Sequence, residues 1–397
     1  MNRDVVSKSA PHVSGAAKPS IKIIYFVTED WYFCSHRLPL ALAAQRSGYD
    51  VTVVTRVNRH GELLRSHGLK LIPIKLSRRS RNPFKELDVI WQLFRIYREQ
   101  RPDIVHHVAL KPVLYGSIAA RLGRVPVVVN ALAGLGFLFV SKQWLARALR
   151  SLVEVALRML LNRPNVRVIL QNQDDLSLLI GRGVLESKRA VLIRGSGVDT
   201  VLFHPTPEPT GVPVVVLASR MLWDKGVKEF VEAAHRLKEM GSSARFVLVG
   251  GGDPENPTSI SCAQLSQWSD EGVIEWWGQQ EDMPQVFSKS HIVCLPTVYG
   301  EGVPKVLIEA AACARAIVAT DVPGCREIVQ DNKNGLLVPA RDVEGLVVAL
   351  KQLIADPALR NKMGECGRVM VEEEFSIEQV VRETLALYQD LLPAVKV

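Results

Sequence analysis

The sequence predicts an α/β protein built from two doubly wound domains, each with a parallel sheet between layers of helices. The chain has 397 residues, of which 47% are apolar, and this is enough for two or three domains with buried cores. Short β-branched runs alternate with longer helical patterns from residue 21 onward, as in βαβ units. The alternation starts again after residue 213, behind a proline-rich segment.

Short apolar runs rich in valine and isoleucine are expected to be the strands, because each is bounded by turn residues and is too short for a helix. The stretches between them, such as residues 36–48 and 86–100, carry apolar residues at helical spacing. The runs are IKIIYFV, DVTVVT, LKLIPIKL, DIVHHV, VPVVVNA and VRVILQN in the first half, and PVVVLASR, ARFVLVG, VIEWWG, HIVCLPT, AIVAT and GLLVP in the second.

The proline-rich segment FHPTPEPTGVP, residues 203–213, is the expected boundary between the domains. We expect a disordered tail over residues 1–20, an N-terminal domain over 21–203 and a C-terminal domain over 204–375. Residues 376–397 are expected to form a helix that crosses back to the N-terminal domain. Two facing sheets of this kind turn the carboxyl ends of their strands toward a common cleft, where ligands bind.

Charge is divided unevenly along the chain. Residues 1–200 contain 31 basic and 14 acidic residues, a net charge of about +17, whereas the remainder contains 18 and 27, a net charge of about −9. No uncharged run is long and regular enough to span a bilayer, and the N-terminus lacks the apolar core of a secretory signal, so we expect a cytoplasmic protein. The six cysteines show no paired spacing and no clustered histidines, so neither a disulfide framework nor a zinc site is expected.

Two strand-to-helix loops of the second half carry residues that suit a nucleotide sugar. SRMLWDKG places Arg220 and Lys225 directly after a strand, and two cations at a cleft suit a diphosphate. VYGEGVPKVLIEA places Glu301 and Glu309 eight residues apart, so that a loop carboxylate and a helix carboxylate look into one cleft. A buried Glu309 needs a hydrogen-bonding partner, which a ribose diol would supply. A solvated turn and surface salt bridges are the alternatives.

Five motifs in order resemble the large group of retaining glycosyltransferases with the GT-B fold. The resemblance extends from residue 21 to about 390 and implies transfer of a sugar from a UDP-sugar, or another nucleoside-diphosphate sugar, to an acceptor hydroxyl with retention at the anomeric carbon. No further cofactor is implied. The sequence has no DxD motif at a strand end, so cations and a helix N-terminus are expected to neutralise the leaving diphosphate in place of a metal ion. The motifs are GSGVDTVLFHP, SRMLWDKG, EGVPKVLIE, VPGCREIV and NGLLVP.

The same resemblance assigns roles to residues of the second half. It implies that Arg220 and Lys225 clamp the donor diphosphate, that Glu309 contacts the ribose and that Glu301 contacts the transferred sugar. An exposed lysine is the alternative for Lys305, and a plain turn is the alternative for the glycine triplet that contains Gly251. The further donor contacts that the resemblance implies are Gly251, Asp282, Lys305 and Gly324.

The first half is expected to bind the acceptor. Ser35 can cap a helix and so place His36 and Arg37 in its first turn, facing the cleft, although His36 could instead pack under Trp31. The other acceptor contacts that we expect are Lys111 and Gly134.

A histidine near the transferred sugar is also implied by the resemblance. The strand DIVHHV ends in His106 and His107, and consecutive strand residues face opposite sides, so only one of them can line a given surface. His107 is the candidate catalytic histidine. Packing in the core is expected for the other.

Four segments resemble the bacterial enzymes that extend polyprenyl-diphosphate-linked sugars for cell-surface glycans. This resemblance implies a lipid-linked saccharide acceptor and a peripheral position on the inner face of the cell membrane. Residues 141–163 could form an amphipathic membrane-contacting helix, with an ordinary core-facing helix as the alternative. The segments are SHRLPLALAA, HHVALKPVLYGSIAAR, VNALAGLGFLF and EGVPKVLIEA. The cations of that helix are Lys142, Arg147, Arg150 and Arg158, and its apolar contacts would be Trp144, Leu145, Leu149, Leu152, Val153 and Leu160.

Two alternatives of other classes stay open. A nucleotide-sugar epimerase has the same architecture without an acceptor, and incubation with the donor alone distinguishes it from a transferase. A basic membrane-binding or nucleic-acid-binding protein would use the positively charged first half. No helix-turn-helix, RNP or zinc pattern supports the nucleic-acid alternative, so no nucleic-acid partner is expected.

Overall fold

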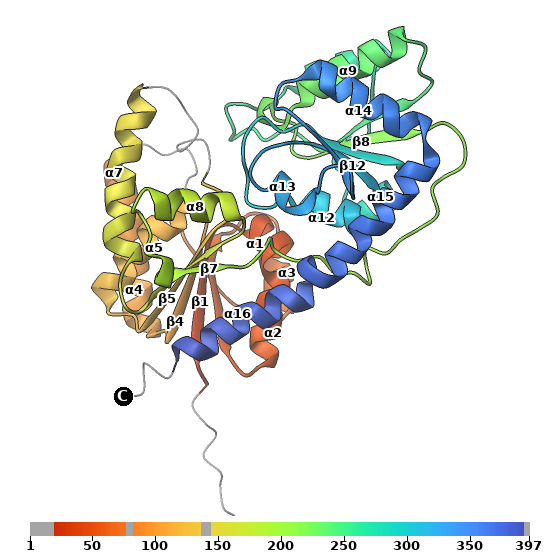
Figure 1. The fold of residues 1–397 in the computed structure, drawn as a ribbon. Helices are drawn as coiled ribbons and strands as arrows, with labels where there is room; N and C mark the ends of the chain where they lie inside the picture. Colours follow the sequence, from red (N-terminus) through yellow and green to blue (C-terminus); the bar gives the residue numbers. More distant parts are fainter. Residues whose placement is uncertain (1–19, 77–81, 136–143, 393–397) are drawn as a thin grey trace, which may run out of the picture.

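The structure is a computed structural model of the 397-residue chain, and it describes residues 20–76, 82–135 and 144–392. In these residues the chain forms two parallel sheets with helices on both faces of each (Figure 1). The N-terminal sheet has the strand order β3-β2-β1-β4-β5-β6-β7, and the C-terminal sheet has the order β10-β9-β8-β11-β12-β13. The prediction of two doubly wound α/β domains is therefore confirmed.

Each apolar run that the sequence analysis selected contains a strand. The edge strand β7 was not expected from the sequence, because its three residues are too few to give a recognisable pattern. The strands are β1 (Lys22–Glu29), β2 (Asp50–Arg56), β3 (Lys70–Pro73), β4 (Ile104–Val108), β5 (Val127–Leu132), β6 (Val166–Leu170), β7 (Ala190–Leu192), β8 (Val214–Ala218), β9 (Arg245–Val249), β10 (Glu275–Trp276), β11 (Ile292–Leu295), β12 (Ala316–Thr320) and β13 (Gly335–Val338).

The helices connect successive strands and cover both faces of the sheets. Several begin at a side-chain cap, as α4 does where Asn82 Oδ1 accepts from Phe84 N at 3.0 Å. The helices are α1 (Asp30–His36), α2 (Leu38–Arg46), α3 (Gly61–Ser66), α4 (Pro83–Gln100), α5 (Leu110–Gly123), α7 (Trp144–Leu161), α8 (Gln173–Gly181), α9 (Val227–Glu239), α10 (Cys262–Asp270), α11 (Met283–Ser288), α12 (Lys305–Ala312), α13 (Cys325–Ile328), α14 (Val343–Ala355), α15 (Pro357–Met370) and α16 (Ile377–Leu391), with short turns η1 (Ser187–Arg189), η2 (Trp223–Lys225) and η3 (Val371–Phe375).

Strand order determines where each sheet can hold a ligand. The order reverses between β1 and β4 in the N-terminal sheet and between β8 and β11 in the C-terminal sheet. Ligands of open parallel sheets bind outside the carboxyl ends of the strands at such reversals. The loops that follow β1, β4, β8 and β11 are therefore the parts of the chain from which a site is expected.

The last helix, α16, belongs to the core of the first domain. Val380, Leu387, Tyr388 and Leu391 pack in one cluster with β1, β2 and α2. The Tyr388 hydroxyl is hydrogen-bonded to His106 Nδ1. Figure 1 shows the chain leaving the C-terminal domain through α15 and running along the N-terminal domain as α16.

Helix α7 corrects part of the membrane-helix expectation. Val153 and Leu160 pack against the core, and Arg158 donates its Nε to Gly183 O at 2.8 Å, so these three side chains serve the fold. Leu152 is 67% exposed. Lys142 and the side chains of Trp144, Leu145, Arg147 and Leu149 lie outside the described residues. Among the helices that the structure describes, none has the length and hydrophobicity needed to cross a bilayer.

Candidate active site

The loops after β8 and β11 pack directly against each other. Gly226, which ends the first loop, has φ 74°, and a Cβ there would lie 1.9 Å from Pro296 O. Only glycine fits this approach. It allows Lys225 Nζ to donate to Glu301 Oε1 at 2.6 Å, with the two side chains 17% and 28% exposed. One cation and one carboxylate of the predicted donor site are thus in contact.

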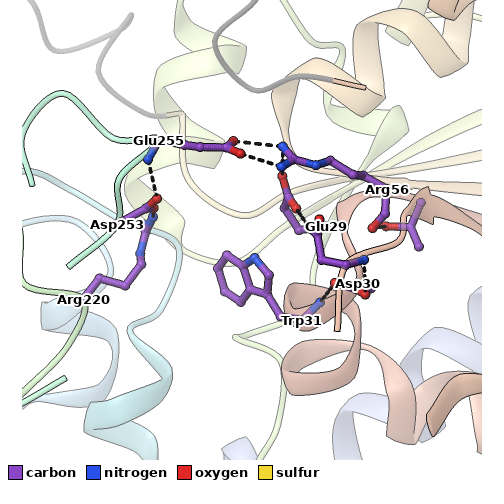
Figure 2. Close-up of polar contacts among 9 residues, drawn as sticks. Glu29, Asp30, Trp31, Arg56, Arg220, Asp253 and Glu255 are labelled. Carbon is purple, nitrogen blue, oxygen red and sulfur yellow. Dashed lines mark hydrogen bonds and ion pairs between the residues drawn. The ribbon is translucent and has the colours of Figure 1, made fainter. Parts of the chain in front are cut away.

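Arg220 lies on the side of this site that faces the N-terminal domain. Its Nη1 donates to Asp253 Oδ2 at 2.8 Å, and its guanidinium lies 6.0 Å from the centroid of the Trp31 ring (Figure 2). Beside this contact, Arg56 forms a bidentate pair with Glu255 at 2.9 and 2.5 Å. Residues at the carboxyl ends of β1 and β2 therefore meet residues that follow β8 and β9.

Helix α12 adds another cation and another carboxylate to the site. Lys305 Nζ lies 3.3 Å from Glu309 Oε1 and donates to Ser35 O in the N-terminal domain at 2.7 Å. Burial raises the pKa of Glu309, and the charge of Lys305 opposes this rise. A buried carboxylate with a single cationic neighbour still has acceptor capacity for hydroxyl groups.

The peptide of Glu301 and Gly302 is held by both domains. Asn172 Nδ2, from the loop after β6, donates to Glu301 O at 3.0 Å and to Gly302 O at 3.3 Å. A Cβ on Gly134 would lie 2.8 Å from Gly302 N, and a Cβ on Gly324 would lie 1.9 Å from Gly302 O. The predicted residues Gly134 and Gly324 are thus close-approach glycines, Gly134 against Gly302 N and Gly324 against Gly302 O.

His36 is the last residue of α1, and α2 begins at Leu38 without a side-chain cap, so the expectation that Ser35 caps a helix with His36 and Arg37 in its first turn is wrong. His36 still reaches this interface, and its surroundings keep it neutral. Burial together with the charges of Lys305 and Arg37 lowers the pKa of His36 to about 3. Its ring stacks on Tyr32 with centroids 4.2 Å apart, so the alternative of packing under Trp31 is wrong.

Arg37 is 4% exposed, and in the described part of the chain its Nε and Nη2 have no hydrogen-bond partner. A buried guanidinium without partners is costly, which favours an anionic or hydroxyl-rich ligand at this position.

The expectation that His107 contacts the transferred sugar is wrong. Its side chain is fully buried, with Nδ1 2.7 Å from Asn130 Oδ1 and Nε2 3.0 Å from the Tyr97 hydroxyl. Since the Asn130 oxygen only accepts, Nδ1 carries the proton and Nε2 accepts from Tyr97. Burial lowers the pKa of His107 to about 4. His106 is buried on the other face against Tyr388, so both histidines serve the core.

Three further residues were predicted from the sequence to contact the donor or the acceptor. Lys111 Nζ pairs with Glu86 inside the N-terminal domain, at 2.9 Å from Oε2. Gly251 O accepts from Met221 N at 2.9 Å, which places it beside the Arg220 loop. Asp282 caps α11 by accepting from Gln285 N at 3.0 Å. The described contacts do not bring Lys111 or Asp282 to the cluster around Glu301.

Comparison with known proteins agrees with this geometry. Residues 22–172 match the sequence family described as "Glycosyl transferase 4-like", and residues 212–356 match "Glycosyl transferases group 1". The chain is a glycosyltransferase with a 4-like first domain and a group 1 second domain. The two matches fall on the two sheets, so the family covers both sides of the site.

Two relatives of this glycosyltransferase are named for the sugars that they transfer and for their acceptors. It is 29% identical to N,N'-diacetylbacillosaminyl-diphospho-undecaprenol alpha-1,3-N-acetylgalactosaminyltransferase of Campylobacter jejuni, over 82% of this chain and 87% of that one. It is 24% identical to UDP-Gal:alpha-D-GlcNAc-diphosphoundecaprenol alpha-1,3-galactosyltransferase of Escherichia coli, over 78% and 80%.

Solved structures show the same fold. Sucrose-phosphate synthase from Thermosynechococcus elongatus superposes with a TM-score of 0.77 at 20% identity, covering 94% of this chain and 100% of that one. Anabaena HepE in complex with UDP superposes with a TM-score of 0.74 at 17% identity, covering 94% and 100%. The GT-B fold of this glycosyltransferase is therefore confirmed.

Three residues of the glycosyltransferase site were not selected from its sequence. Asn172 has a usable signal, because an Asn between a strand and a helix, three residues before Asp175, is an N-cap pattern. Asp253 and Trp31 have none, since their roles depend on how the domains face each other. No group of three or more His, Cys, Asp or Glu side chains suited to a metal ion occurs within the described ranges.

Proposed function

We propose that this glycosyltransferase moves a hexosyl or N-acetylhexosaminyl group from a UDP-sugar to a polyprenyl-diphosphate-linked saccharide, with retention at the anomeric carbon. The observation that carries the proposal is the meeting of Lys225 with Glu301 and of Lys305 with Glu309 at the strand-order reversal of the C-terminal sheet, beside the N-terminal domain. Cations at this edge suit a diphosphate, and a buried carboxylate suits a ribose or sugar hydroxyl.

The chemistry assigned to the site is electrostatic. Arg220 and Lys225 would stabilise the charge that develops on the departing UDP, together with the N-terminus of α12. Asp253 and Glu301 pair with these cations, so the donor phosphates would displace or share existing partners. A retaining transfer can then proceed on one face, with a donor phosphate oxygen accepting the proton of the acceptor hydroxyl. We expect this reaction to need neither a metal ion nor a cofactor.

The acceptor part of the proposal is supported by the N-terminal side of the interface. The two relatives above are named for acceptors linked to undecaprenyl diphosphate. Arg37 supplies a buried guanidinium without a described partner, which suits an anionic or hydroxyl-rich acceptor group. Such an acceptor resides in a membrane, so the enzyme would work at the inner surface of the cell membrane in the assembly of cell-surface polysaccharide.

The test combines purified enzyme with a panel of UDP-sugars and an undecaprenyl-diphosphate-linked saccharide, and it measures the mass of the lipid product. Product of one added sugar, formed equally in EDTA, is expected, and NMR of the new linkage gives the anomeric configuration. Conversion of the UDP-sugar to its epimer in the absence of an acceptor would show that the protein is a nucleotide-sugar epimerase. An inverted linkage would refute the retaining assignment.

A further inference from the structure

A small pocket opens at the edge of the N-terminal sheet opposite to the active site. Its volume is about 250 Å³, and it lies between the end of α5, the starts of β5 and β6, and the end of α7. The strands of a parallel sheet point the same way, so the amino ends that line this pocket lie a full strand length from the loops after β5 and β6, which carry the active-site residues Gly134 and Asn172. The pocket is separate from the transfer site.

Three arginines line this pocket: Arg121, Arg124 and Arg163. Within the described residues, none of their side chains makes a hydrogen bond or an ion pair, and the first two are exposed. Unpaired like charges repel one another, so their gathering around one hollow lacks a structural reason within the fold. A ligand with negative charge would remove this repulsion.

Two neighbouring arginines, Arg167 and Arg189, add positive charge beside the pocket. Arg167 Nη1 donates to Pro164 O at 3.2 Å, and Arg189 Nη1 donates to the same oxygen at 3.0 Å. Burial and the charge of Arg189 lower the pKa of Arg167. The turn at residues 162–165 is thus contacted by the guanidinium groups of Arg167 and Arg189. Arginine binds phosphate oxygens with paired N–H donors, so this arrangement fits a phosphate group.

Exposed apolar side chains lie next to the arginines. Leu122, between two of them in sequence, is 58% exposed, and Met159, four residues before Arg163, is 61% exposed. Leu152 and Val155 continue the row along α7, at 67% and 53% exposure. Their spacing of three and four residues puts them on one side of the helix. Phosphate-binding groups bordered by exposed apolar side chains are suited to a phospholipid at the membrane interface.

We propose that Arg121, Arg124 and Arg163 bind the phosphate group of an anionic phospholipid, with Leu122 and the exposed row of α7 entering the acyl boundary. This proposal rests on the proposed function and specifies which residues would bind the membrane and which lipid group they would contact. Helices α4, α5 and α7 lie side by side in the domain, so one flank of it would rest on the membrane (Figure 1). A lipid-linked acceptor could then reach the interface without leaving its bilayer.

The experiment measures binding of the full-length protein to vesicles without donor or acceptor, so it is independent of catalysis. Vesicles of phosphatidylcholine with or without phosphatidylglycerol are floated with wild type and with the triple variant Arg121→Gln, Arg124→Gln and Arg163→Gln. We expect wild type to bind only phosphatidylglycerol vesicles. The triple variant should bind them about 100-fold more weakly, because each basic residue near an anionic surface contributes about 1 kcal/mol.

A matched variant removes the same charge elsewhere: Lys228→Gln, Lys351→Gln and Lys362→Gln, all exposed lysines of the C-terminal domain. It should bind within about threefold of wild type if position matters more than net charge. An equal loss in both variants, or none in the arginine variant, would overturn the proposal. Circular dichroism and thermal unfolding establish that each variant is folded.

A second experiment distinguishes a phospholipid ligand from a free phosphate ligand. The variant Leu122→Ser with Met159→Ser keeps the arginines and should lose vesicle binding while retaining calorimetric binding of glycerol 3-phosphate. Binding of inorganic phosphate by wild type with no vesicle binding would mean that the ligand is a soluble phosphate, and the lipid assignment would be rejected.

Discussion

Replacement of Gly324 by alanine tests whether the backbone around Glu301 sets the rate of transfer. The added Cβ would lie 1.9 Å from Gly302 O, whereas contacts of this kind are not found below 3.0 Å, so the peptide must move by about 1.1 Å. The same Cβ would lie 2.7 Å from Glu301 O, and the Glu301 side chain pairs with Lys225 at 2.6 Å. A displacement of about 1 Å at a reacting centre can cost about 100-fold in rate. We therefore expect kcat for sugar transfer to fall about 100-fold.

The control is Gly241→Ala. Gly241 has φ 84°, close to the 87° of Gly324, but no atom lies within 4 Å of its added Cβ. Both variants should lose about 1 to 3 kcal/mol of unfolding free energy from backbone strain, measured by urea denaturation. Only Gly324→Ala should lose kcat. A folded Gly324→Ala enzyme with kcat within threefold of wild type would refute the positioning argument, as would an equal kcat loss in the control.

Three further predictions concern ionisable residues. Arg220→Ala or Lys225→Ala should lower kcat by about 100- to 1,000-fold in the mass-spectrometric transfer assay, with little change in unfolding free energy. Near-normal turnover by either variant would refute the assignment of these two residues as the diphosphate clamp. His36 is held neutral with a pKa near 3, so unfolding takes up a proton below its ordinary pKa of about 6.5 and stability falls as pH drops through that window. The urea midpoint of His36→Asn should therefore change less than that of wild type between pH 7 and pH 5, and equal changes would contradict the assignment. Arg56 and Glu255 are 29% and 34% exposed, so a double-mutant cycle on unfolding should give a coupling below about 1 kcal/mol, and a larger value would show that this interdomain pair is shielded from solvent.

The strands and the donor side of the site could be read from the sequence because local signals determine them. β-branched runs between turn residues located the strands, and the loops after β8 and β11 carried Arg220, Lys225 and Glu301 next to the sheet. The edge strand β7 has only three residues and pairs with a single neighbour, so its position depends on tertiary contacts.

The wrong predictions about the N-terminal domain have a common physical cause. Strand alternation separates two faces, but both faces of a parallel sheet are covered by helices, so alternation could not show whether His107 or His106 reached the site. Both are in the interior. Helix α7 has apolar residues on its packed side and on its exposed side, so its sequence did not distinguish Val153 and Leu160, which face the core, from Leu152.

The route of the chain through α16 has a consequence for biosynthesis. The core clusters of the second domain draw on residues 198–375, whereas the first domain needs Leu387 and Tyr388 to close its own. A nascent polypeptide therefore exposes an unfinished first domain until α16 leaves the ribosome, and the second domain, although most of it is translated later, is able to finish folding earlier.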